Sequence, residues 1–330
     1  MMQSLLIGVN NLLEKVYAPN ILDQIRRNSL LLEPALDASN VNAHPKTLAD
    51  VEVIFGTWGM PMLDNSFLDL TPKLRAIFYA AGTVKHFVTD DFWQRDVTIC
   101  SAWRANALPV AEFTLGSILL SLKNVWAYHR SIRVTRSWEN HIPTSGGYHG
   151  TVGLVSLGAV GMRVAELLAG FDVDIIAYDP MIDPRRIRDK RIKLVSLEEL
   201  FHCSDVVSLH APWLKETEGM VNGDLVRSMK PYSTLINTAR GAVINEPQLI
   251  EVLREREDLT AFLDVTHGEP PNPNNPLFDL PNVLLTPHVS GSLGEECQRM
   301  GNFMLSEYMR FLHKEPLQHQ ITPNMLQSMA

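Results

Sequence analysis

Three ionisable residues of different chemistry each follow a separate apolar segment in the second half of the chain. Arg240 follows STLINTA, Glu269 follows TAFLDVTHG, and His288 follows NVLLTP. A guanidinium binds a carboxylate through two parallel hydrogen bonds, and an imidazole can give a proton to a carbonyl oxygen. A carboxylate beside that imidazole favours its protonated form. Together the three side chains have the chemistry needed to reduce a 2-oxo acid that receives a hydride.

Each of these residues also has a plain structural interpretation. Arg240 could form a surface ion pair, and Glu269 could be a solvated loop acid. His288 could bond to the backbone near a helix. Their shared position after strands favours the chemical interpretation, because ligands of doubly wound sheets bind at the carboxyl ends of the strands.

Other polar and small residues follow apolar segments in the same part of the chain, and we expect them to contact a ligand as well. They are Asp179; His210, Ala211 and Pro212; Thr217; Thr238 and Ala239; Asp264; and Gly291. The carboxyl ends of parallel strands meet at one edge of a sheet, so these residues should gather beside the trio. The three cysteines, Cys100, Cys203 and Cys297, have no metal-ligand spacing, and we expect no metal site.

Residues 151–180, TVGLVSLGAVGMRVAELLAGFDVDIIAYDP, predict a strand, a glycine turn, a helix and a second strand. This order matches the dinucleotide-binding fingerprint, in which glycines let the backbone approach a pyrophosphate at a helix N-terminus. We therefore expect Gly158, Ala159, Val160 and Gly161 to bind a dinucleotide. The alternatives are a similar unit without a ligand, or a methyltransferase. Gly161 favours the dinucleotide, because close packing of helix on strand leaves no room for a side chain there.

Two positions decide how the fingerprint would bind its cofactor. Asp179 lies 18 positions after Gly161, close to the interval of about 20 at which an acid binds the ribose hydroxyls. Its charge favours NAD over a cofactor with a 2′-phosphate, although Arg185 and Arg186 follow closely enough to reach such a phosphate. Ser156 stands where the first glycine of the fingerprint is expected, and a serine fits that turn without strain only if its φ is negative.

The composition is that of an ordinary globular protein and argues against several classes. The 330 residues can form two domains, with 45% hydrophobic and 20% charged residues. The formal net charge of −8 argues against a nucleic-acid surface, which needs clustered Lys and Arg. The first residues, MMQSLLIGVNNLLEK, lack a signal-peptide pattern, and no run reaches the ~18 apolar residues of a membrane span. Because cysteines are few and scattered, we expect a cytoplasmic protein.

Apolar segments alternate with helical patterns along the chain, which predicts parallel sheets covered by helices on both faces. Before residue 107 the expected strands are LLIGV, LLLEPAL, VEVIFGT, LRAIFYA and VTICSA, and Pro19 opens a helix. The fingerprint and the later strands form a second set. We therefore expect a substrate domain at 1–107 and 292–330, with a cofactor-binding domain at 108–291 inserted into it.

A long apolar helix is expected to begin at Pro109 and to run to residue 132, because a proline fits the first turn of a helix. It is apolar over most of its circumference, so other parts of the protein or a second copy must cover it. Its apolar residues are too many for one buried stripe, which predicts a dimer. They include Val110, Phe113, Leu115, Ile118, Leu119 and Leu122.

Four segments together resemble the D-isomer-specific 2-hydroxyacid dehydrogenases, in the order and at the spacing of that family. They are NALPVAEF at 106–113, INTARG at 236–241, LDVTHGEP at 263–270 and LLTPHVSG at 284–291. The resemblance implies that Arg240 binds substrate, that Glu269 pairs with the imidazole, and that His288 is the acid/base. It also implies two Rossmann-like domains, of which the substrate domain is flavodoxin-like, and NAD as the cofactor.

The resemblance extends to the first domain with two departures. AAGTVKH at 80–86 keeps the family's glycine loop, which implies that the backbone N–H groups of Ala81 and Gly82 hold a substrate carboxylate. Lys85 lies near the place where members usually have Asp. The pair Trp103-Arg104 stands where many members have Pro-Gly or a similar pair, so that loop need not follow the family's path. Members assemble as dimers around the long helix that comes next.

These features predict an NAD-dependent oxidoreductase that acts on a small 2-hydroxy or 2-oxo acid and forms a homodimer, with no nucleic-acid or membrane partner. The alternative is a non-enzymatic NAD(H)-sensing protein, as in the C-terminal-binding-protein corepressors, which use a similar fold. Turnover of 2-oxo acids with NADH would separate the two. Trp58 and Met60 are candidates to line the side-chain pocket for the substrate, although a core role explains them equally well.

Overall fold

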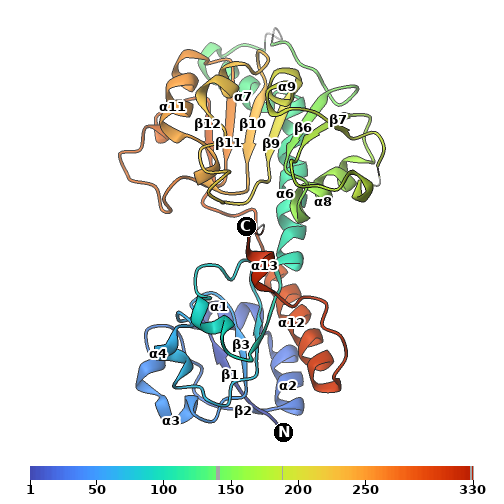
Figure 1. Cartoon of the computed structure of the whole chain (residues 1–330). Helices are drawn as coiled ribbons and strands as arrows, with labels where there is room; N and C mark the ends of the chain where they lie inside the picture. Colours follow the sequence, from blue (N-terminus) through green and yellow to red (C-terminus); the bar gives the residue numbers. More distant parts are fainter. Residues whose placement is uncertain (139–141, 188, 328, 330) are drawn as a thin grey trace. The chain divides into compact units, whose positions relative to one another are not determined.

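The computed structural model describes residues 1–138, 142–187, 189–327 and 329. The chain forms two compact units, each with its own parallel sheet and covering helices (Figure 1). The first unit comprises Met1–Asn106 and Ser292–Met329, and the second comprises Ala107–Gly291. The predicted α/β class with two doubly wound parallel sheets is therefore confirmed.

The first unit is built on a five-stranded sheet in the order β2-β1-β3-β4-β5, in which every pair is parallel. Its strands are β1 (Gln3–Ile7), β2 (Leu30–Leu31), β3 (Val53–Gly56), β4 (Ala76–Tyr79) and β5 (Thr98–Ser101). Its helices are α1 (Asn10–Val16), α2 (Pro19–Asn28), α3 (Pro45–Leu48), α4 (Asn65–Leu68), α5 (Asp90–Trp93), α12 (Glu296–His313) and α13 (Pro323–Leu326). Every residue of β3 and β4 is buried, as expected for parallel strands covered on both faces.

Alternate residues of the central strands face two separate cores. Ile54 and Ile77 belong to one apolar cluster, whereas Phe55 and Phe78 belong to another. The second cluster includes Tyr308 of α12, whose ring centre lies 5.0 Å from that of Phe55 and 5.6 Å from that of Phe78. This packing joins the last long helix to the first unit, where the red α12 accompanies blue elements in Figure 1.

The second strand of this sheet is shorter than the sequence predicted. LLLEPAL forms regular strand only at Leu30–Leu31. Beyond it, the N–H groups of Leu32 and Leu36 still donate to β1, to the carbonyls of Ser4 and Leu6. Pro34 lies between them and has no N–H to donate, which interrupts the ladder.

The second unit is built on a seven-stranded parallel sheet in the order β12-β11-β10-β9-β6-β7-β8. Its strands are β6 (Thr151–Val155), β7 (Asp174–Tyr178), β8 (Lys193–Leu194), β9 (Val206–Leu209), β10 (Thr234–Asn237), β11 (Thr260–Leu263) and β12 (Val283–Leu285). Its helices are α7 (Val125–Thr135), α8 (Ala159–Leu168), α9 (Leu197–Cys203), α10 (Gly223–Arg227) and α11 (Glu246–Glu255). The chain runs outward from β6 to β8 and then returns to β9 on the other side of β6. That reversal marks the ligand-binding point of a doubly wound sheet.

Helix α6 (Trp103–Leu122) begins earlier than the sequence predicted. Pro109 lies in its interior, and the Trp-Arg pair forms its first turn rather than a loop. A proline cannot donate to the carbonyl four residues before it, here that of Ala105, and costs a helix interior about 3 kcal/mol. Ala105 and Ala111 on this part of the helix are completely buried, which offsets part of that cost.

The expected helix is also interrupted before residue 132. Asn124 adopts a left-handed φ of 50° between α6 and α7, a conformation that asparagine tolerates better than most residues. Its side-chain amide donates to the carbonyl of Pro143 at 2.8 Å. The two helices are therefore separate elements.

The apolar character of α6 contributes to the core of the second unit. Ile118 and Leu122 are buried in one cluster with Val152 and Leu154 of β6. By length and composition α6 is apolar enough to cross a membrane, contrary to the expectation that no run is long enough. However, 56% of that stretch is buried inside the protein, as in a core helix.

Candidate active site

The residues predicted to bind a cofactor lie at the carboxyl ends of the strands of the second unit, in loops and in the first turn of α8. Because all seven strands are parallel, these ends form one edge of the sheet. After β6 come Gly158, Ala159, Val160 and Gly161, and after β7 comes Asp179. After β9 come His210, Ala211, Pro212 and Thr217, and after β10 come Thr238, Ala239 and Arg240. Asp264 follows β11, and β12 is followed by His288 and Gly291.

The glycine turn after β6 forms a backbone cradle at the N-terminus of α8. A Cβ on Gly161 would lie 2.1 Å from the carbonyl oxygen of Ser156, so only glycine lets the helix approach the turn this closely. Around Gly158, by contrast, no other part of the described chain lies within 4 Å of an added Cβ. An open cradle beside the first N–H groups of α8 fits a pyrophosphate.

Ser156 occupies the first glycine position with a left-handed φ of 76°, so the condition for an unstrained serine is not met. This conformation costs a residue with a side chain roughly 1–2 kcal/mol. Contacts on both sides impose it, since the N–H of Ser156 donates to the carbonyl of Tyr178 at 2.7 Å while its own carbonyl lies against Gly161.

Asp179 lies beside this turn, and its carboxylate is already hydrogen-bonded within the protein. Oδ2 accepts from the N–H of Leu157 at 2.7 Å and from the hydroxyl of Ser156 at 3.3 Å. Oδ1 accepts from the N–H groups of Met181 and Ile182 at 2.9 and 3.0 Å. Donors from the turn after β6 and from the loop that follows Asp179 therefore fix the orientation of this acid together.

His210 is a buried imidazole at the same edge of the sheet. It is 8% exposed, and neither ring nitrogen has a hydrogen-bond partner in the described part of the chain. Burial lowers the pKa of His210 to about 3, so the ring is neutral near pH 7. Its Cδ2 lies 3.4 Å from where a Cβ on Gly161 would be, which places the ring against the glycine turn. Buried polar atoms without partners are rare, and here they fit a bound cofactor.

Two of the predicted threonines have structural contacts of their own. The hydroxyl of Thr217 donates to the carbonyl of Pro212 at 2.5 Å and accepts from the N–H of Leu214 at 2.9 Å. The hydroxyl of Thr238 lies 2.9 Å from that of Thr114 on α6. Both therefore shape loops at the edge of the sheet, and their contact with a cofactor stays a prediction.

The predicted acid/base pair lies in direct contact. Nδ1 of His288 is 2.6 Å from Oε2 of Glu269, and the two side chains are 47% and 38% exposed. Because an ionised carboxylate can only accept, Nδ1 carries the proton and Nε2 is left for exchange with a ligand. Burial lowers the pKa of Arg240, and the negative charge of Glu269 opposes that effect. The structure thus brings the three predicted ionisable residues together.

Arg240 is held by a loop that depends on a glycine and an asparagine. Asn237 is buried, and its amide donates to the carbonyl of Arg240 at 2.9 Å and accepts from the N–H of Ala239 at 3.0 Å. A Cβ on Gly241 would lie 1.9 Å from the carbonyl carbon of Thr266. Glycine therefore lets the Arg240 loop touch the loop that carries Glu269.

Asp264 has a role that sequence reasoning missed. It is 1% exposed, and Oδ1 accepts from the hydroxyl of Thr286 and from the N–H of Val289 at 2.8 Å. Oδ2 accepts from the N–H of Ser290 at 2.9 Å. The N–H of His288 donates to the carbonyl of Asp264, also at 2.9 Å. This carboxylate orders the loop that carries the imidazole, and the cofactor contact predicted from its strand-end position stays a prediction.

Glu246 was also missed, because it lies at the start of a helix and not after a strand. Its carboxylate accepts from the N–H of His267 at 3.1 Å and from the side-chain amide of Asn275 at 2.7 Å. The hydroxyl of Thr266 donates to the carbonyl of Gly268 at 2.8 Å. These contacts shape the loop that ends at Glu269.

In the first unit, Ala81 and Gly82 lie in the loop after β4. The hydroxyl of Ser101 donates to the carbonyl of Gly82, and its oxygen lies 3.1 Å from the carbonyl oxygen of Ala81. Among the described residues, neither N–H of the pair has a protein acceptor, but Ala81 is 0% exposed, and anion binding by these amides stays a prediction. Met60 is 7% exposed and Trp58 partly buried in this unit, and both pack in its core.

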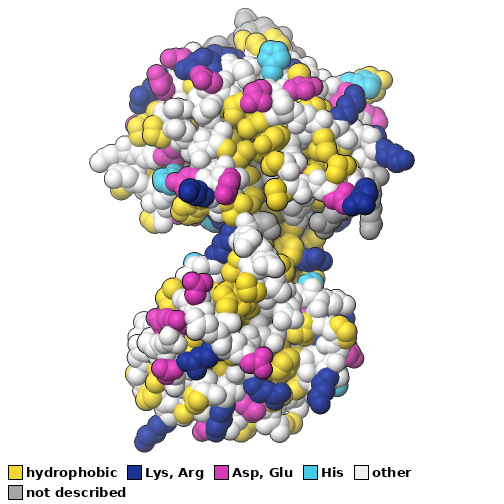
Figure 2. Space-filling view, viewed as in Figure 1, with side chains coloured by type: hydrophobic (Ala, Val, Ile, Leu, Met, Phe, Trp, Pro, Cys, Tyr) yellow, Lys and Arg dark blue, Asp and Glu magenta, His cyan; other side chains and the backbone are white. Residues whose placement is uncertain are grey.

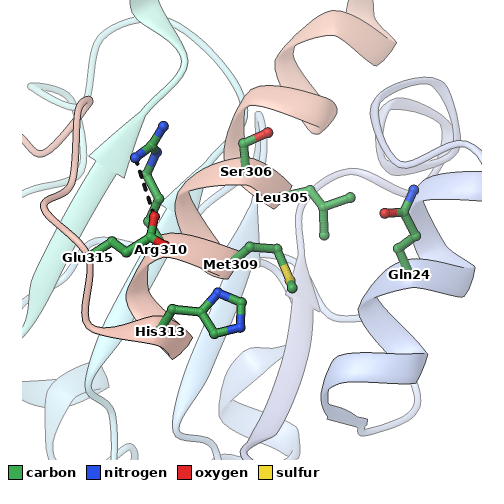
Figure 3. Close-up of a pocket in the computed structure, with 7 residues that line it drawn as sticks. All are labelled: Gln24, Leu305, Ser306, Met309, Arg310, His313 and Glu315. Atoms are coloured by element: carbon green, nitrogen blue, oxygen red, sulfur yellow. Dashed lines mark ion pairs between the residues drawn. The ribbon is translucent and has the colours of Figure 1, made fainter.

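Two hollows elsewhere contain none of the predicted site residues. One lies along α12, with Arg310 and Glu315 paired at 3.6 Å at its rim and Gln24 of α2 at its other side (Figure 3). The second is lined by His202, Cys203, Ser228, Met229, Lys230 and Pro231. In the described ranges no group of His, Cys, Asp and Glu is arranged to bind a metal ion.

The part of the chain that forms the second sheet matches the model of a known protein family. The model of the NAD binding domain of D-isomer specific 2-hydroxyacid dehydrogenases matches residues 115–290. The chain belongs to the D-isomer specific 2-hydroxyacid dehydrogenase family. The matched range includes the glycine turn and all three ionisable residues, so the resemblance drawn from the motifs and the NAD cofactor are confirmed.

Relatives of this dehydrogenase family differ in substrate. The glyoxylate reductase of Thermofilum pendens is 33% identical over 77% of this chain and 76% of its own. The D-3-phosphoglycerate dehydrogenase of Archaeoglobus fulgidus is 27% identical over 91% of this chain and 56% of its own. The chain thus spans only about half the length of the phosphoglycerate dehydrogenases that it matches.

Solved structures of other dehydrogenases have the same fold as this chain. The D-isomer specific 2-hydroxyacid dehydrogenase of Lactobacillus delbrueckii ssp. bulgaricus, in its NAD complexed form, has a TM-score of 0.80 at 20% identity. It covers 97% of this chain and 100% of its own. The NAD-dependent formate dehydrogenase of Staphylococcus aureus has a TM-score of 0.70 at 26% identity, covering 96% and 97%. These comparisons give no support to the corepressor alternative.

Proposed function

We propose that this protein is an NAD-dependent dehydrogenase that interconverts a 2-oxo acid and the D-2-hydroxy acid. The observation that carries the proposal is the His288–Glu269 contact of 2.6 Å beside Arg240, at the ligand-binding edge of the NAD-binding sheet. An acid/base, its orienting carboxylate and a carboxylate-binding guanidinium are the groups that this reaction requires.

Each residue of the trio has one role in reduction. NAD(H), when bound, supplies the hydride chemistry. Arg240 binds the substrate carboxylate and polarises the carbonyl, and its burial strengthens both interactions because little water screens them. His288 gives the proton on Nε2 to the carbonyl oxygen. Glu269 holds the ring through Nδ1 and stabilises the imidazolium before the proton leaves.

The cofactor would lie along the residues at the strand ends of the second unit. The turn at Gly158 and Gly161 takes the pyrophosphate, and His210 offers a ring nitrogen that the protein leaves without a partner. Asp179 takes the ribose hydroxyls and disfavours a 2′-phosphate, while Arg185 is engaged with Asp183 at 2.8 Å. The remaining proposed contacts are Ala159, Val160, Ala211, Pro212, Thr217, Thr238, Ala239, Arg240, Asp264, His288 and Gly291.

We also propose substrate contacts in the first unit. The N–H groups of Ala81 and Gly82, which have no protein acceptor among the described residues, would bind a carboxylate. Residues 1–107 and 292–330 would then act as the substrate domain and residues 108–291 as the NAD-binding domain. On the face in Figure 2, Lys and Arg side chains are scattered among Asp and Glu, which agrees with a small-molecule partner rather than a nucleic acid. We propose a cytoplasmic homodimer.

A turnover assay tests this function. The purified chain is mixed with NADH and a panel of 2-oxo acids that includes glyoxylate, pyruvate and larger analogues, and NADH oxidation is followed by absorbance. We expect turnover of at least one acid. Tight NADH binding with no turnover across the panel would overturn the proposal in favour of a nucleotide-binding protein.

A further inference from the structure

Ser156 and Asp179 form a contact that distinguishes this chain within its own fingerprint. Asp179 accepts four hydrogen bonds, of which three come from backbone N–H groups at 2.7 to 3.0 Å. The fourth comes from the hydroxyl of Ser156 at 3.3 Å. A carboxylate has about four lone-pair sites, so this carboxylate is saturated before any ligand arrives.

The four donors are not equally easy to displace. The N–H groups of Leu157, Met181 and Ile182 belong to the backbone on either side of the site, and their loss would require the loops to move. The hydroxyl of Ser156 makes the longest of the four bonds, and rotation about χ1 of Ser156 is enough to break it. A ribose hydroxyl that binds Asp179 therefore takes the place of Ser156.

We propose that the Ser156 hydroxyl competes with the cofactor's ribose for Asp179, and that Ser156 thereby weakens NADH binding. This inference rests on the proposed NAD site and adds an affinity-determining residue to it. A glycine at this position, as the fingerprint expects, would leave one lone-pair site of Oδ2 available to the ribose, beside the bond from the N–H of Leu157.

The backbone of Ser156 has a separate effect that must be distinguished from competition. Its φ of 76° is strained for serine or alanine but not for glycine. Relief of that strain stabilises the free protein. Removal of the hydroxyl raises the affinity for the cofactor, because the hydrogen bond between Ser156 and Asp179 no longer has to be broken when the ribose binds.

Two substitutions on the full-length protein separate these effects. Ser156→Ala removes the hydroxyl and keeps the Cβ, whereas Ser156→Gly removes both. The Kd of NADH is measured by calorimetry, and the Tm is measured without cofactor. We expect both variants to bind NADH about three- to tenfold more tightly than the parent. Only Ser156→Gly should raise the Tm of the free protein.

A double-mutant cycle with Asp179→Asn tests whether the effect passes through this carboxylate. We expect Asp179→Asn to weaken NADH binding, and we expect Ser156→Ala to leave the Kd unchanged within twofold in that background. An equal gain in both backgrounds would show that the serine acts by another route and would overturn the inference.

Other outcomes also decide the matter. Unchanged affinity in Ser156→Ala would exclude competition, and weaker binding in that variant would show that the hydroxyl contacts the cofactor itself. Either result overturns the inference and leaves the proposed function standing. Failure of the parent protein to bind NADH would instead remove the proposed function on which the inference rests.

Discussion

His288 is the only group of the trio placed to exchange a proton, because Glu269 occupies its Nδ1 and Nε2 remains available. We expect His288→Ala to lower kcat for 2-oxo acid reduction by roughly 10²–10⁴-fold, the range of general acid catalysis. Steady-state kinetics with the best acid from the panel measures the loss. The Kd of NADH should stay within a few-fold, and His202→Ala, on α9, should behave as the parent. Near-parental turnover in His288→Ala would exclude the proposed role.

Glu269 acts on the reaction through His288, whose Nδ1 lies 2.6 Å from its Oε2. Glu269→Gln removes the negative charge that stabilises the imidazolium and keeps the size of the side chain. We therefore expect a lower kcat for 2-oxo acid reduction, with the Kd of NADH kept. Steady-state kinetics of parent and variant measure this change, and equal kcat values would contradict the pairing role.

His210 should make stability depend on pH in a defined window. Burial lowers its pKa from the usual value of about 6.5 to about 3, so between these values the unfolded chain binds a proton that the folded chain does not. Stability conferred by the neutral ring is therefore lost as pH falls below about 6.5. We expect the parent to lose about 2 kcal/mol more unfolding free energy than His210→Leu between pH 7 and pH 5. Urea unfolding of both proteins measures this, and equal losses would exclude a buried neutral ring.

At the scale of elements, the site depends on the contact between the loops after β10 and β11. A Cβ on Gly241 would lie 1.9 Å from backbone of Thr266, so Gly241→Ala must push the Arg240 loop away from the Glu269 loop. A displacement of about 1 Å can cost 10²-fold in rate, and we expect a loss of that order in kcat/KM.

Gly116→Ala is the matched control for this change, because no other part of the described chain lies within 4 Å of the added Cβ. It should keep parental kinetics. Circular dichroism should show that Gly241→Ala remains folded. A folded Gly241→Ala variant with parental kcat/KM would show that the loop contact is not needed for the reaction.

At the scale of the whole molecule, the protein's own core uses part of the apolar range 109–132 that the sequence predicts at a dimer interface. Ile118 and Leu122 are in the protein's own core, and Phe113 packs against it. Leu120, Val125 and Ile132 of that range are 42%, 36% and 39% exposed, and exposed apolar side chains continue past it to Val134 at 84% and Trp138 at 91%. Exposed apolar groups of this size in one segment indicate a protein interface.

We therefore expect the chain to form a dimer of about twice its 37.1 kDa mass. Light scattering at micromolar concentration measures this mass. The double variant Val134→Glu, Trp138→Glu should shift the mass toward the monomer, because it places charge on the proposed interface. Exposed Met181→Glu, in the loop after β7, is the control and should remain dimeric. A parental mass near that of one chain would contradict the dimer.

The sequence by itself determined the features that arise from local patterns. Strands such as β6 and β7 are short apolar runs beside a glycine turn, so their positions follow from periodicity and turn chemistry. Arg240, Glu269 and His288 follow separate strands, and parallel pairing brings strand ends to one edge of a sheet. Their proximity could therefore be predicted without a structure.

Only the tertiary structure decided the features that depend on residues far apart in the chain. Asp264 orders the His288 loop through a bond to Ser290 that spans 26 positions, and Gly241 is required by a backbone that arrives from the next strand. Pro109 lies inside α6 because burial of the surrounding turn outweighs a local helix rule. Ser156 takes its left-handed φ because Tyr178 and Gly161 hold the turn from both sides. Local propensity sets preferences of about 1–3 kcal/mol, and long-range packing of this kind overrides them.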